Sequence, residues 1–415
     1  MSTAQEQFAA REKRFNDAVN LKNKGRIPVS FAYGQYFATE IAGISKKEAM
    51  FDFDKLTKAW KDFNIRYDLD MATFPALFPA KGHEILGIKS MKWPGGALRD
   101  HEAFQYLESD YLKEGEYDAY LNDPDGFVMK NIWPRISSLM APLADLELSP
   151  LSFLDNAFSL PLILGSTVSN PVILNLLEKL VKLGQTMGAY ENAVKGYQEE
   201  MTVLGYPIVS LAEGICAFDW VSTMLRGMEG SMLDMFSQSD KLLKTIASLT
   251  PATIMAGVIG CEMTNLSRFG LPLFRGSKGF MSDEQFQKFY WPSLKELICG
   301  LVDSGITPVV VFEGDYTPRL EYLRELPKGK VAAHFEHIDR KKFKQVLGDH
   351  MCFWGNVSSS SLIFGTKEQI QDEVKELIDV LGDTGGLIID GAHGIPDEAK
   401  PENIATMVET VRMYT

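Results

Sequence analysis

The sequence is poor in cysteine. Its 415 residues contain only four, Cys216, Cys261, Cys299 and Cys352, and no two of them form a CxxC pair. This spacing does not indicate a disulfide framework, and a reduced, cytoplasmic setting is the simplest interpretation.

Long apolar runs and positive charge are also scarce. The chain starts with polar residues, and we find no uninterrupted apolar run long enough to span a membrane. The formal net charge of −13 argues against nucleic acid and against an anionic membrane surface as partners. The Gly385-Gly386 pair lacks any accompanying GxGxxG or Walker pattern, so it indicates a turn and not a phosphate loop.

The chain has an ordinary globular composition and a regular alternation of elements. Hydrophobic residues make up 45% and charged residues 23%, which is enough to build a sizeable core. From residue 271 onward, short apolar runs alternate with amphipathic stretches, which predicts βα units and a parallel sheet. The strands predicted here are 271–274, 308–312, 330–334, 351–354 and 386–390, and the helices are 282–303, 316–326, 339–347, 366–382 and 401–414.

The amino half has the same pattern with more interruptions. Residues 1–24 predict a leading helix, and the capping-box pair Ser45 and Glu48 begins a helix at 45–63. Further strands are expected at 29–32, 66–73 and 207–211, and further helices at 174–202 and 221–258, the latter broken at Pro251. The irregular stretch from about 75 to 150 predicts an insertion over the barrel mouth, a candidate lid. The number of predicted βα units fits eight better than five or six. We therefore predict one α/β domain over 1–415, a (β/α)8 TIM-type barrel with an N-terminal extension.

Three side chains that can bind a metal follow predicted strands. Glu313 follows the run at 309–312, His334 follows 331–333, and His393 comes shortly after 387–389. The carboxyl ends of all strands in a parallel barrel open on one face, where the active site lies. The sequence therefore predicts that these three side chains converge on one metal ion. Glu336 is a reserve ligand, because alternation along a strand places it on the same face as His334.

Glu313 and His334 each also have an ordinary structural interpretation. Glu313 could cap the following helix or pair with Arg319, and His334 could be a hydrogen-bonded interior histidine. The interpretation as a metal site depends on all three lying at strand ends of one barrel.

A series of short motifs, in order along the chain, resembles the uroporphyrinogen decarboxylase superfamily. The motifs are AGIS at 42–45, FQYLE at 104–108, GFMS at 279–282, FYWP at 289–292, EGDYT at 313–317, LPKGK at 326–330, GNV at 355–357, HGI at 393–395 and AKPEN at 399–403. This superfamily includes porphyrinogen decarboxylases and corrinoid-dependent methyltransferases on a (β/α)8 barrel. Its Gly-His-Gly motif, at the position of His393, also occurs in metal-free decarboxylases.

The segment after the first predicted strand separates the two branches. The decarboxylases resembled here carry an arginine-rich segment there, which binds a tetrapyrrole with many carboxylates. Residues 31–36 of this chain read FAYGQY and contain no arginine. This departure favours the methyltransferase branch.

The ligands expected from that branch are changed in this chain. In related zinc methyltransferases the pattern is His-x-Cys, then a second ligand, then a late Cys. By position, Glu313 falls at the first Cys, His334 at the second ligand and His393 at the late Cys, while Val311 replaces the first His. Carboxylate and imidazole ligands leave zinc a stronger Lewis acid than thiolates do, which suits activation of an oxygen leaving group over activation of a thiol.

The resemblance therefore implies a cytoplasmic zinc-dependent methyltransferase. It would demethylate a small methoxylated compound, most simply an aromatic one, and deliver the methyl group to the Co(I) of a separate corrinoid protein. Candidate substrate-binding residues are Tyr33, Asp219, Trp220 and Arg275, while the oligomeric state stays open and includes a homo-oligomer. The alternatives are a metal-free decarboxylase and a barrel that binds corrinoid proteins without catalysis.

Overall fold

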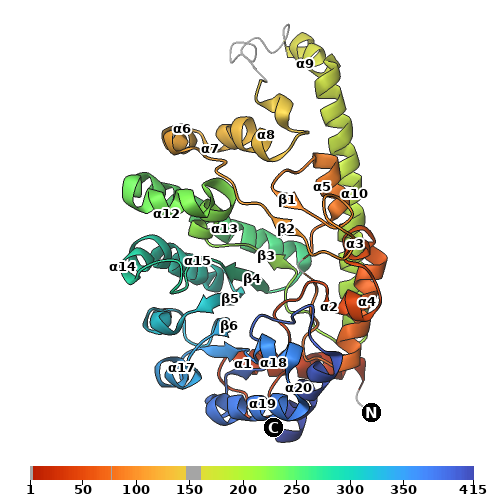
Figure 1. The fold of residues 1–415 in the computed structure, drawn as a ribbon, viewed down its shortest axis with the longest axis vertical. Coiled ribbons are helices and arrows are strands. Elements are labelled where there is room, and N and C mark those ends of the chain that lie inside the picture. The colour runs from red at the N-terminus through yellow and green to blue at the C-terminus, as the bar shows by residue number, and fades with distance from the viewer. Residues whose placement is uncertain (1–2, 76, 146–159) are drawn as a thin grey trace.

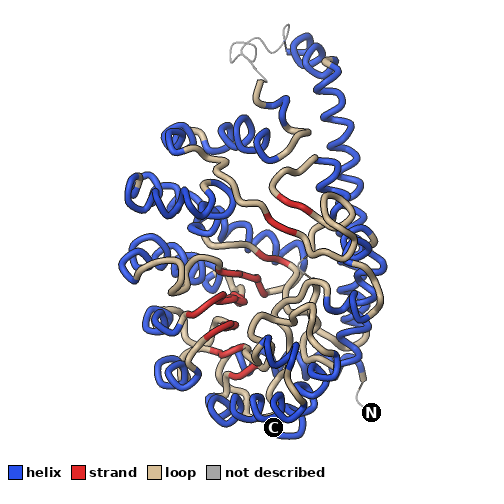
Figure 2. Tube along the Cα trace, viewed as in Figure 1, coloured by secondary structure: helices blue, strands red, loops and turns tan. Residues whose placement is uncertain are grey.

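The chain forms a closed barrel of eight parallel strand segments. The computed structural model describes residues 3–75, 77–145 and 160–415. Six strands form one parallel sheet in the order β3 to β8 (Figures 1 and 2). Two short segments close it: Val29 forms a parallel bridge with Ile389, and Ala72 forms one with Ile208. The Asp70 amide joins these segments by donating to the Val29 carbonyl at 2.9 Å.

The sheet strands are short and buried, as expected of a barrel covered by helices. They are β3 Ala212–Glu213, β4 Arg268–Leu273, β5 Thr307–Asp315, β6 Ala332–His337, β7 Cys352–Trp354 and β8 Leu387–Ile388. The longer helices are α1 Ala4–Val19, α4 Phe53–Tyr67, α9 Leu160–Ser169, α10 Pro171–Val203, α12 Gly227–Ser237, α13 Ser239–Thr264, α15 Trp291–Asp303, α17 Arg340–Leu347, α19 Lys367–Leu381 and α20 Pro401–Tyr414.

The predicted (β/α)8 fold is confirmed, with local corrections. The Ser45 capping box is present, but Asp52 ends α3 (Lys46–Phe51) and caps α4, so the single helix expected at 45–63 is two. The strand expected at 66–73 starts later, because α4 continues to Tyr67. The predicted break at Pro251 is wrong: α13 runs through it. The leading helix is shorter than 1–24 and ends at Val19.

Helix α1 closes the base of the barrel. Its Phe15, Ala18 and Val19 are buried together with interior side chains from the strand segments. The ring of Phe15 meets Trp354 of β7 edge to face, with ring centres 5.4 Å apart. Ion pairs fix the helix at the rim, among them Glu12 with Arg268 of β4 at 2.5 Å. Since the amino ends of the strands are closed in this way, the open end is the carboxyl end.

The insertion predicted at 75–150 consists of short helices and one antiparallel pair, β1 (Met91–Lys92) with β2 (Gln105–Tyr106). Residues 76 and 146–150 of it lie outside the described residues. Buried Arg226 fastens the insertion to α12: its Nη1 donates to the Leu112 carbonyl at 2.7 Å, and its Nε pairs with Asp234 at 2.5 Å. Tyr117 of the insertion donates to the same carboxylate at 2.6 Å.

One helix of the described residues, α13, is long and apolar enough to cross a membrane by length and composition, although the sequence analysis found no run of that length. The bent pair α9 and α10, at 80° to each other, also passes this test. Helix α13 packs against α15 and β4, as outer helices of a barrel do.

We expect Phe15→Ala to lower the free energy of unfolding by about 3–5 kcal/mol, because it removes a fully buried ring from the base of the barrel. Urea denaturation followed by circular dichroism measures this change. Phe364→Ala, at a residue 78% exposed, is the control and should change stability by less than about 0.5 kcal/mol. Equal losses in both variants would contradict the role given to α1.

Candidate functional site at the barrel mouth

Glu313 reaches the mouth through an irregularity in β5. The register between β5 and β6 shifts between Phe312 and Asp315, and Gly314 takes a φ of 81°. An added Cβ at Gly314 would lie 2.7 Å from the Ser277 hydroxyl, so glycine is needed here. The Gly314 amide donates to a Glu336 carboxylate oxygen at 2.6 Å. The bulge therefore brings the carboxylates of β5 and β6 close together.

The carboxyl group of Glu313 is hard to ionise. Burial, followed by the carboxylates of Glu336 and Asp219, raises its pKa to about 8, while Arg275 acts in the opposite direction. A proton or another cation beside Glu313 would relieve this like-charge repulsion. Glu313 does not pair with Arg319, which instead pairs with Asp283.

His334 is fully buried, and one edge of its ring is held by the protein. Its Nε2 lies 3.1 Å from the Asp390 carboxylate and 3.1 Å from the Gly391 carbonyl. Its Nδ1 is buried with no hydrogen-bond partner. A carboxylate that holds one ring nitrogen leaves the other available as a metal ligand, which is a common arrangement around protein-bound metals.

Asp390 is a site residue that the sequence analysis did not select. It is fully buried, it follows β8, and it accepts the Ala32 amide at 2.7 Å in addition to the contact with His334. The signal used for Glu313, a polar residue directly after a buried strand, was also present at this position.

His393 and Tyr33 face each other at the mouth. The Tyr33 hydroxyl lies 2.7 Å from the imidazole of His393, and the two rings meet edge to face with centres 5.0 Å apart. His393 Nδ1 lies 4.0 Å from the Glu336 carboxylate, and its side chain is 46% exposed. Burial and the nearby carboxylates, Glu313 first, raise the pKa of Tyr33 well above its ordinary value, so its phenol stays protonated.

The carboxylate of Glu313 and the imidazoles of His334 and His393 are groups that bind divalent cations. The structure does not bring the three together around one point. Within the described ranges, no three His, Cys, Asp or Glu side chains lie close enough together to hold a metal ion. The features that fit a metal are the unpartnered Nδ1 of His334 and the repulsion at Glu313. The assignment of Glu313, His334 and His393 as ligands therefore stays a prediction, with Glu336 beside two of them.

Asp219 lies beneath the mouth and not on its surface. It is fully buried and accepts the amides of Phe274 at 2.9 Å and Arg275 at 3.1 Å and the Tyr290 hydroxyl at 2.8 Å. Burial raises its pKa to about 6. In the structure, Asp219 fixes the loop after β4, and any contact with substrate stays a prediction.

The other two candidate substrate-binding residues are Trp220, next to Asp219 in the chain, and Arg275, within this loop. Trp220 is 36% exposed at the end of α11 (Ala217–Trp220). Arg275 forms an ion pair with Glu108 of the insertion and stacks on Phe280, with its guanidinium 5.0 Å from the ring centre. Its charge is therefore already partnered.

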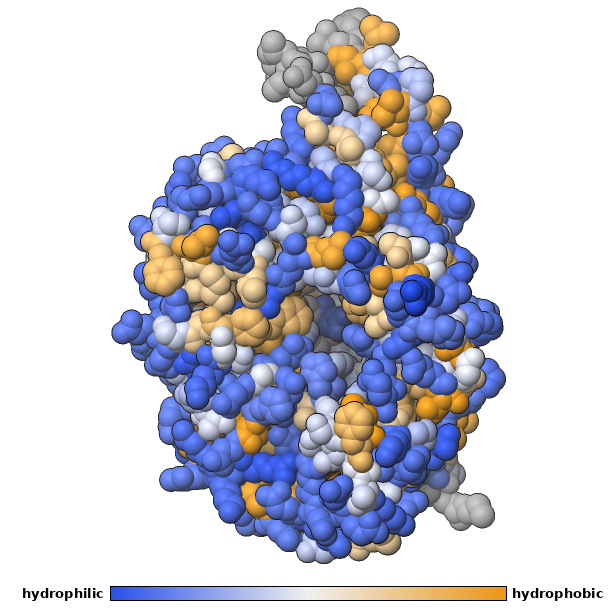
Figure 3. Space-filling model, viewed as in Figure 1, coloured by the Kyte–Doolittle hydropathy of each residue, from blue (hydrophilic) through white to orange (hydrophobic). Residues whose placement is uncertain are grey.

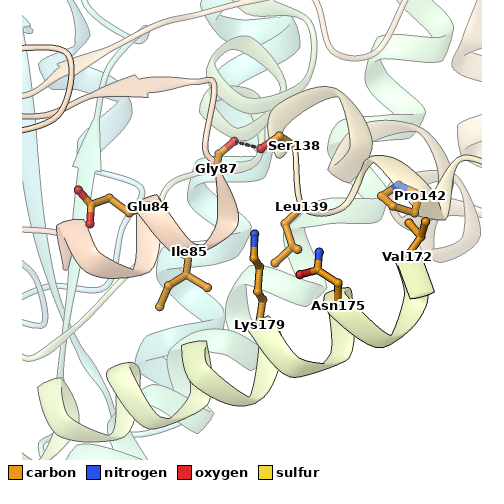
Figure 4. A pocket seen from close by; sticks show the side chains of 9 residues that line it. All are labelled: Glu84, Ile85, Gly87, Ser138, Leu139, Pro142, Val172, Asn175 and Lys179. Atoms are coloured by element: carbon orange, nitrogen blue, oxygen red, sulfur yellow. Dashed lines mark hydrogen bonds between the residues drawn. The ribbon is translucent and has the colours of Figure 1, made fainter. Parts of the chain in front are cut away.

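Figure 3 shows the molecule hollowed near its centre, beside β3 to β5 and α2 (Phe37–Ile41), with hydrophobic surface along one side. Two separate cavities lie elsewhere. A small one, about 160 Å³, is lined by Glu84, Ser138 and Lys179 among others, between α5 (Ala80–Leu86) and α10 (Figure 4). A larger one, about 540 Å³, lies at the base beside Arg26 and Thr415.

This barrel, with its polar strand ends at one mouth, has known relatives. The model of the uroporphyrinogen decarboxylase (URO-D) family matches residues 164–414, so the chain belongs to that family. It is 29% identical over 201 residues to a uroporphyrinogen decarboxylase of Geobacter metallireducens, covering 48% of this chain and 55% of that protein. It is 32% identical over 133 residues to a uroporphyrinogen decarboxylase of Geobacter sulfurreducens, covering 32% of this chain and 38% of that protein. The matched segment thus spans about half the length, or less, of these relatives.

A solved structure extends the fold similarity over nearly the whole chain. A methyltransferase from Methanosarcina mazei superposes with a TM-score of 0.66 at 15% identity, covering 97% of this chain and 98% of that one. This likeness confirms the barrel fold, including the amino half that the family model leaves unmatched.

The raised pKa of Glu313 predicts how stability depends on pH. Between its ordinary value of 4.5 and about 8, the unfolded chain has lost this proton and the folded chain keeps it, so stability falls as pH rises through this window. We expect Glu313→Gln to stabilise the metal-free protein at pH 9 by roughly 2–4 kcal/mol, with little effect near pH 4.5. Urea denaturation at several pH values measures this.

Glu336→Gln is the matched control, because it removes the neighbouring charge and should move the falling limb of the stability curve to lower pH. A Glu313→Gln effect that does not change between pH 4.5 and pH 9 would contradict the assignment.

Proposed function

We propose that the protein is a zinc-dependent methyltransferase that demethylates a small methoxylated aromatic compound and passes the methyl group to the Co(I) of a separate corrinoid protein. Zinc would be held by Glu313, His334 and His393, with Glu336 as the alternative carboxylate. The observation that carries the proposal is the free Nδ1 of His334, buried at a mouth where carboxylates repel each other.

The charge of the mouth supports this function over decarboxylation of a tetrapyrrole. The carboxylates of Glu313, Glu336 and Asp390 all act on Tyr33, and Arg275, which acts on Glu313, is paired with Glu108. A substrate with many carboxylates would meet these acidic groups, while the Arg275 guanidinium is already engaged with Glu108. A neutral ether does not carry this penalty.

The side chains around the mouth would then have defined roles in the reaction. Asp390 holds His334 through Nε2, which leaves Nδ1 without a hydrogen-bond partner and available to a metal. Tyr33, protonated and beside His393, presents a hydroxyl that can donate to an oxygen of the substrate. A bound zinc ion would supply Lewis acidity toward the leaving oxygen as the carbon–oxygen bond breaks and the cobalt–carbon bond forms.

Metal analysis and transfer assays test the proposal together. We expect about one zinc per chain, and methyl transfer from methoxylated phenols to a Co(I) corrinoid protein, followed by the change in the cobalt absorption spectrum. Glu313→Ala, His334→Ala and His393→Ala should each lose zinc and transfer activity. His350→Ala, at an imidazole bound to the Leu326 carbonyl, is the matched control and should keep both.

Full transfer by zinc-free protein would rule out the zinc mechanism, and zinc retained by the three variants would rule out the ligand assignment. Release of CO2 from a porphyrinogen, without methyl transfer, would support the decarboxylase alternative instead.

The variant Asp390→Asn tests whether the Asp390 carboxylate orients His334 as a metal ligand. Groups that orient a metal-bound histidine typically contribute about 10–100-fold to metal affinity. We expect the zinc dissociation constant of this variant to rise by that factor while the fold is retained, as measured by competition with a chromophoric chelator. Unchanged affinity would remove Asp390 from the site.

A further inference from the structure

Glu213, the last residue of β3, is an acidic side chain that the proposed mechanism does not use. In the sheet it pairs with Gly270 of β4, which pairs with Val309 of β5, and Val309 belongs to the buried cluster inside the barrel. Paired residues of neighbouring strands point to the same side of the sheet, so Glu213 faces the barrel interior. Ala212 faces outward, since a Cβ added at Gly260 of α13 would lie 2.9 Å from the Ala212 Cβ.

The carboxylate of Glu213 lies toward the open end of the barrel and is reached by solvent. Val209, earlier on the same segment, is in the buried cluster at the base, so Glu213 lies further toward the mouth. Glu213 is exposed although it faces inward, and it therefore lines the hollow beside β3 (Figure 3). The paired position on the next strand is Gly270, where an added Cβ would lie 3.2 Å from the Glu213 Cβ. The missing side chain leaves room beside Glu213.

The Glu213 carboxylate is unpaired within the part of the chain that the structure describes. No hydrogen bond or ion pair from those residues reaches it, and burial is the one cause that raises its pKa. Burial, followed by the charge of Glu213, raises the pKa of Tyr190 on α10 to about 12, but the Tyr190 hydroxyl donates to the Leu77 carbonyl at 3.5 Å. By contrast, Glu336 and Asp390 each accept a backbone amide. Glu213 thus differs from these two acids in having free oxygens.

A carboxylate that is partly withdrawn from water is stabilised by a hydrogen-bond donor or a cation. Glu213 does not belong to a cluster of metal ligands, because no three His, Cys, Asp or Glu side chains gather in the described ranges and no neighbouring acid contributes to its raised pKa. The donor therefore has to come from a bound molecule. Since β4 separates β3 from β5, a substrate held at the proposed zinc ligands would extend across the inner face of β4 to meet Glu213.

We propose that Glu213 binds a hydrogen-bond donor on the substrate, either a ring hydroxyl or a protonated amine, and so selects methoxylated aromatic compounds that carry such a group. This role rests on the proposed function, because Glu213 would hold the far end of the substrate whose methoxy oxygen meets the metal. It fits the acidic groups around Tyr33, which disfavour a carboxylate on the ring and tolerate a neutral or cationic donor.

Isothermal titration calorimetry of the protein as purified, without any corrinoid protein, tests this role. The probes are guaiacol, ortho-methoxybenzylamine and veratrole, which carry a hydroxyl, an amine and no donor beside the methoxy group. We expect the wild type to bind one of the first two roughly 10-fold or more tighter than veratrole, and the tighter one identifies the donor. Glu213→Leu should lose this preference and leave the affinity for veratrole unchanged. Glu199→Gln, at a side chain 68% exposed on α10, is the control and should keep the preference.

Urea denaturation separates recognition from misfolding. Glu213→Leu breaks no contact with a described residue, so its unfolding midpoint should not fall, and a lower midpoint would overturn the role in substrate binding. Equal binding of all three probes, binding of none, or a preference that Glu213→Leu retains would overturn it as well. A preference that depends on Glu213, in a protein without zinc or methyl transfer, would support the role of Glu213 and contradict the zinc mechanism. Methyl transfer with equal binding of the probes would do the reverse.

Discussion

The buried carboxylate of Asp390 links the closure of the barrel to the position of His334. It lies just after β8, accepts the amide of Ala32 from the first strand segment, and holds His334 of β6. A fully buried carboxylate is costly unless its oxygens are occupied, so these contacts are maintained together. The direction in which His334 offers its free nitrogen is thus set by the same group that joins the first and last strands.

The mouth above Asp390 holds more acidic groups than it can ionise freely. Burial, followed by the neighbouring carboxylates, raises the pKa of both Glu313 and Tyr33, so the Tyr33 phenol stays protonated. A proton or a bound cation at these oxygens would relieve the same repulsion. The negative charge of this mouth disfavours polyanions, whatever the shape of its pocket.

The sequence predicted the barrel well because its signals are local. Buried apolar runs and amphipathic helices identified β5 to β8 and the helices α15, α16 (Leu320–Leu323), α17, α19 and α20, and strand ends pointed to the mouth. The amino half was harder, since Asp52 ends one helix and caps the next within what reads as a single helix. Pro251 indicated a break that tertiary packing of α13 overrides.

Site details that depend on long-range geometry could not be predicted in the same way. The bulge at Gly314 depends on Glu336, 22 residues later, which accepts its amide. The burial of Asp219 depends on Tyr290 and on the loop after β4, which hold it below the surface. Side chains at strand ends can be assigned to a mouth from sequence, but their depth and partners cannot.

The anchoring of the insertion separates two parts of the protein that can change independently. Arg226 and Arg275 attach the insertion to the α12 region and to the loop after β4, whereas the proposed ligands come from β5, β6 and the segment after β8. Substitutions in the insertion alter one half of the rim and leave the other half intact. Evolution could therefore change the compound that the mouth accepts without rebuilding the chemistry beneath it.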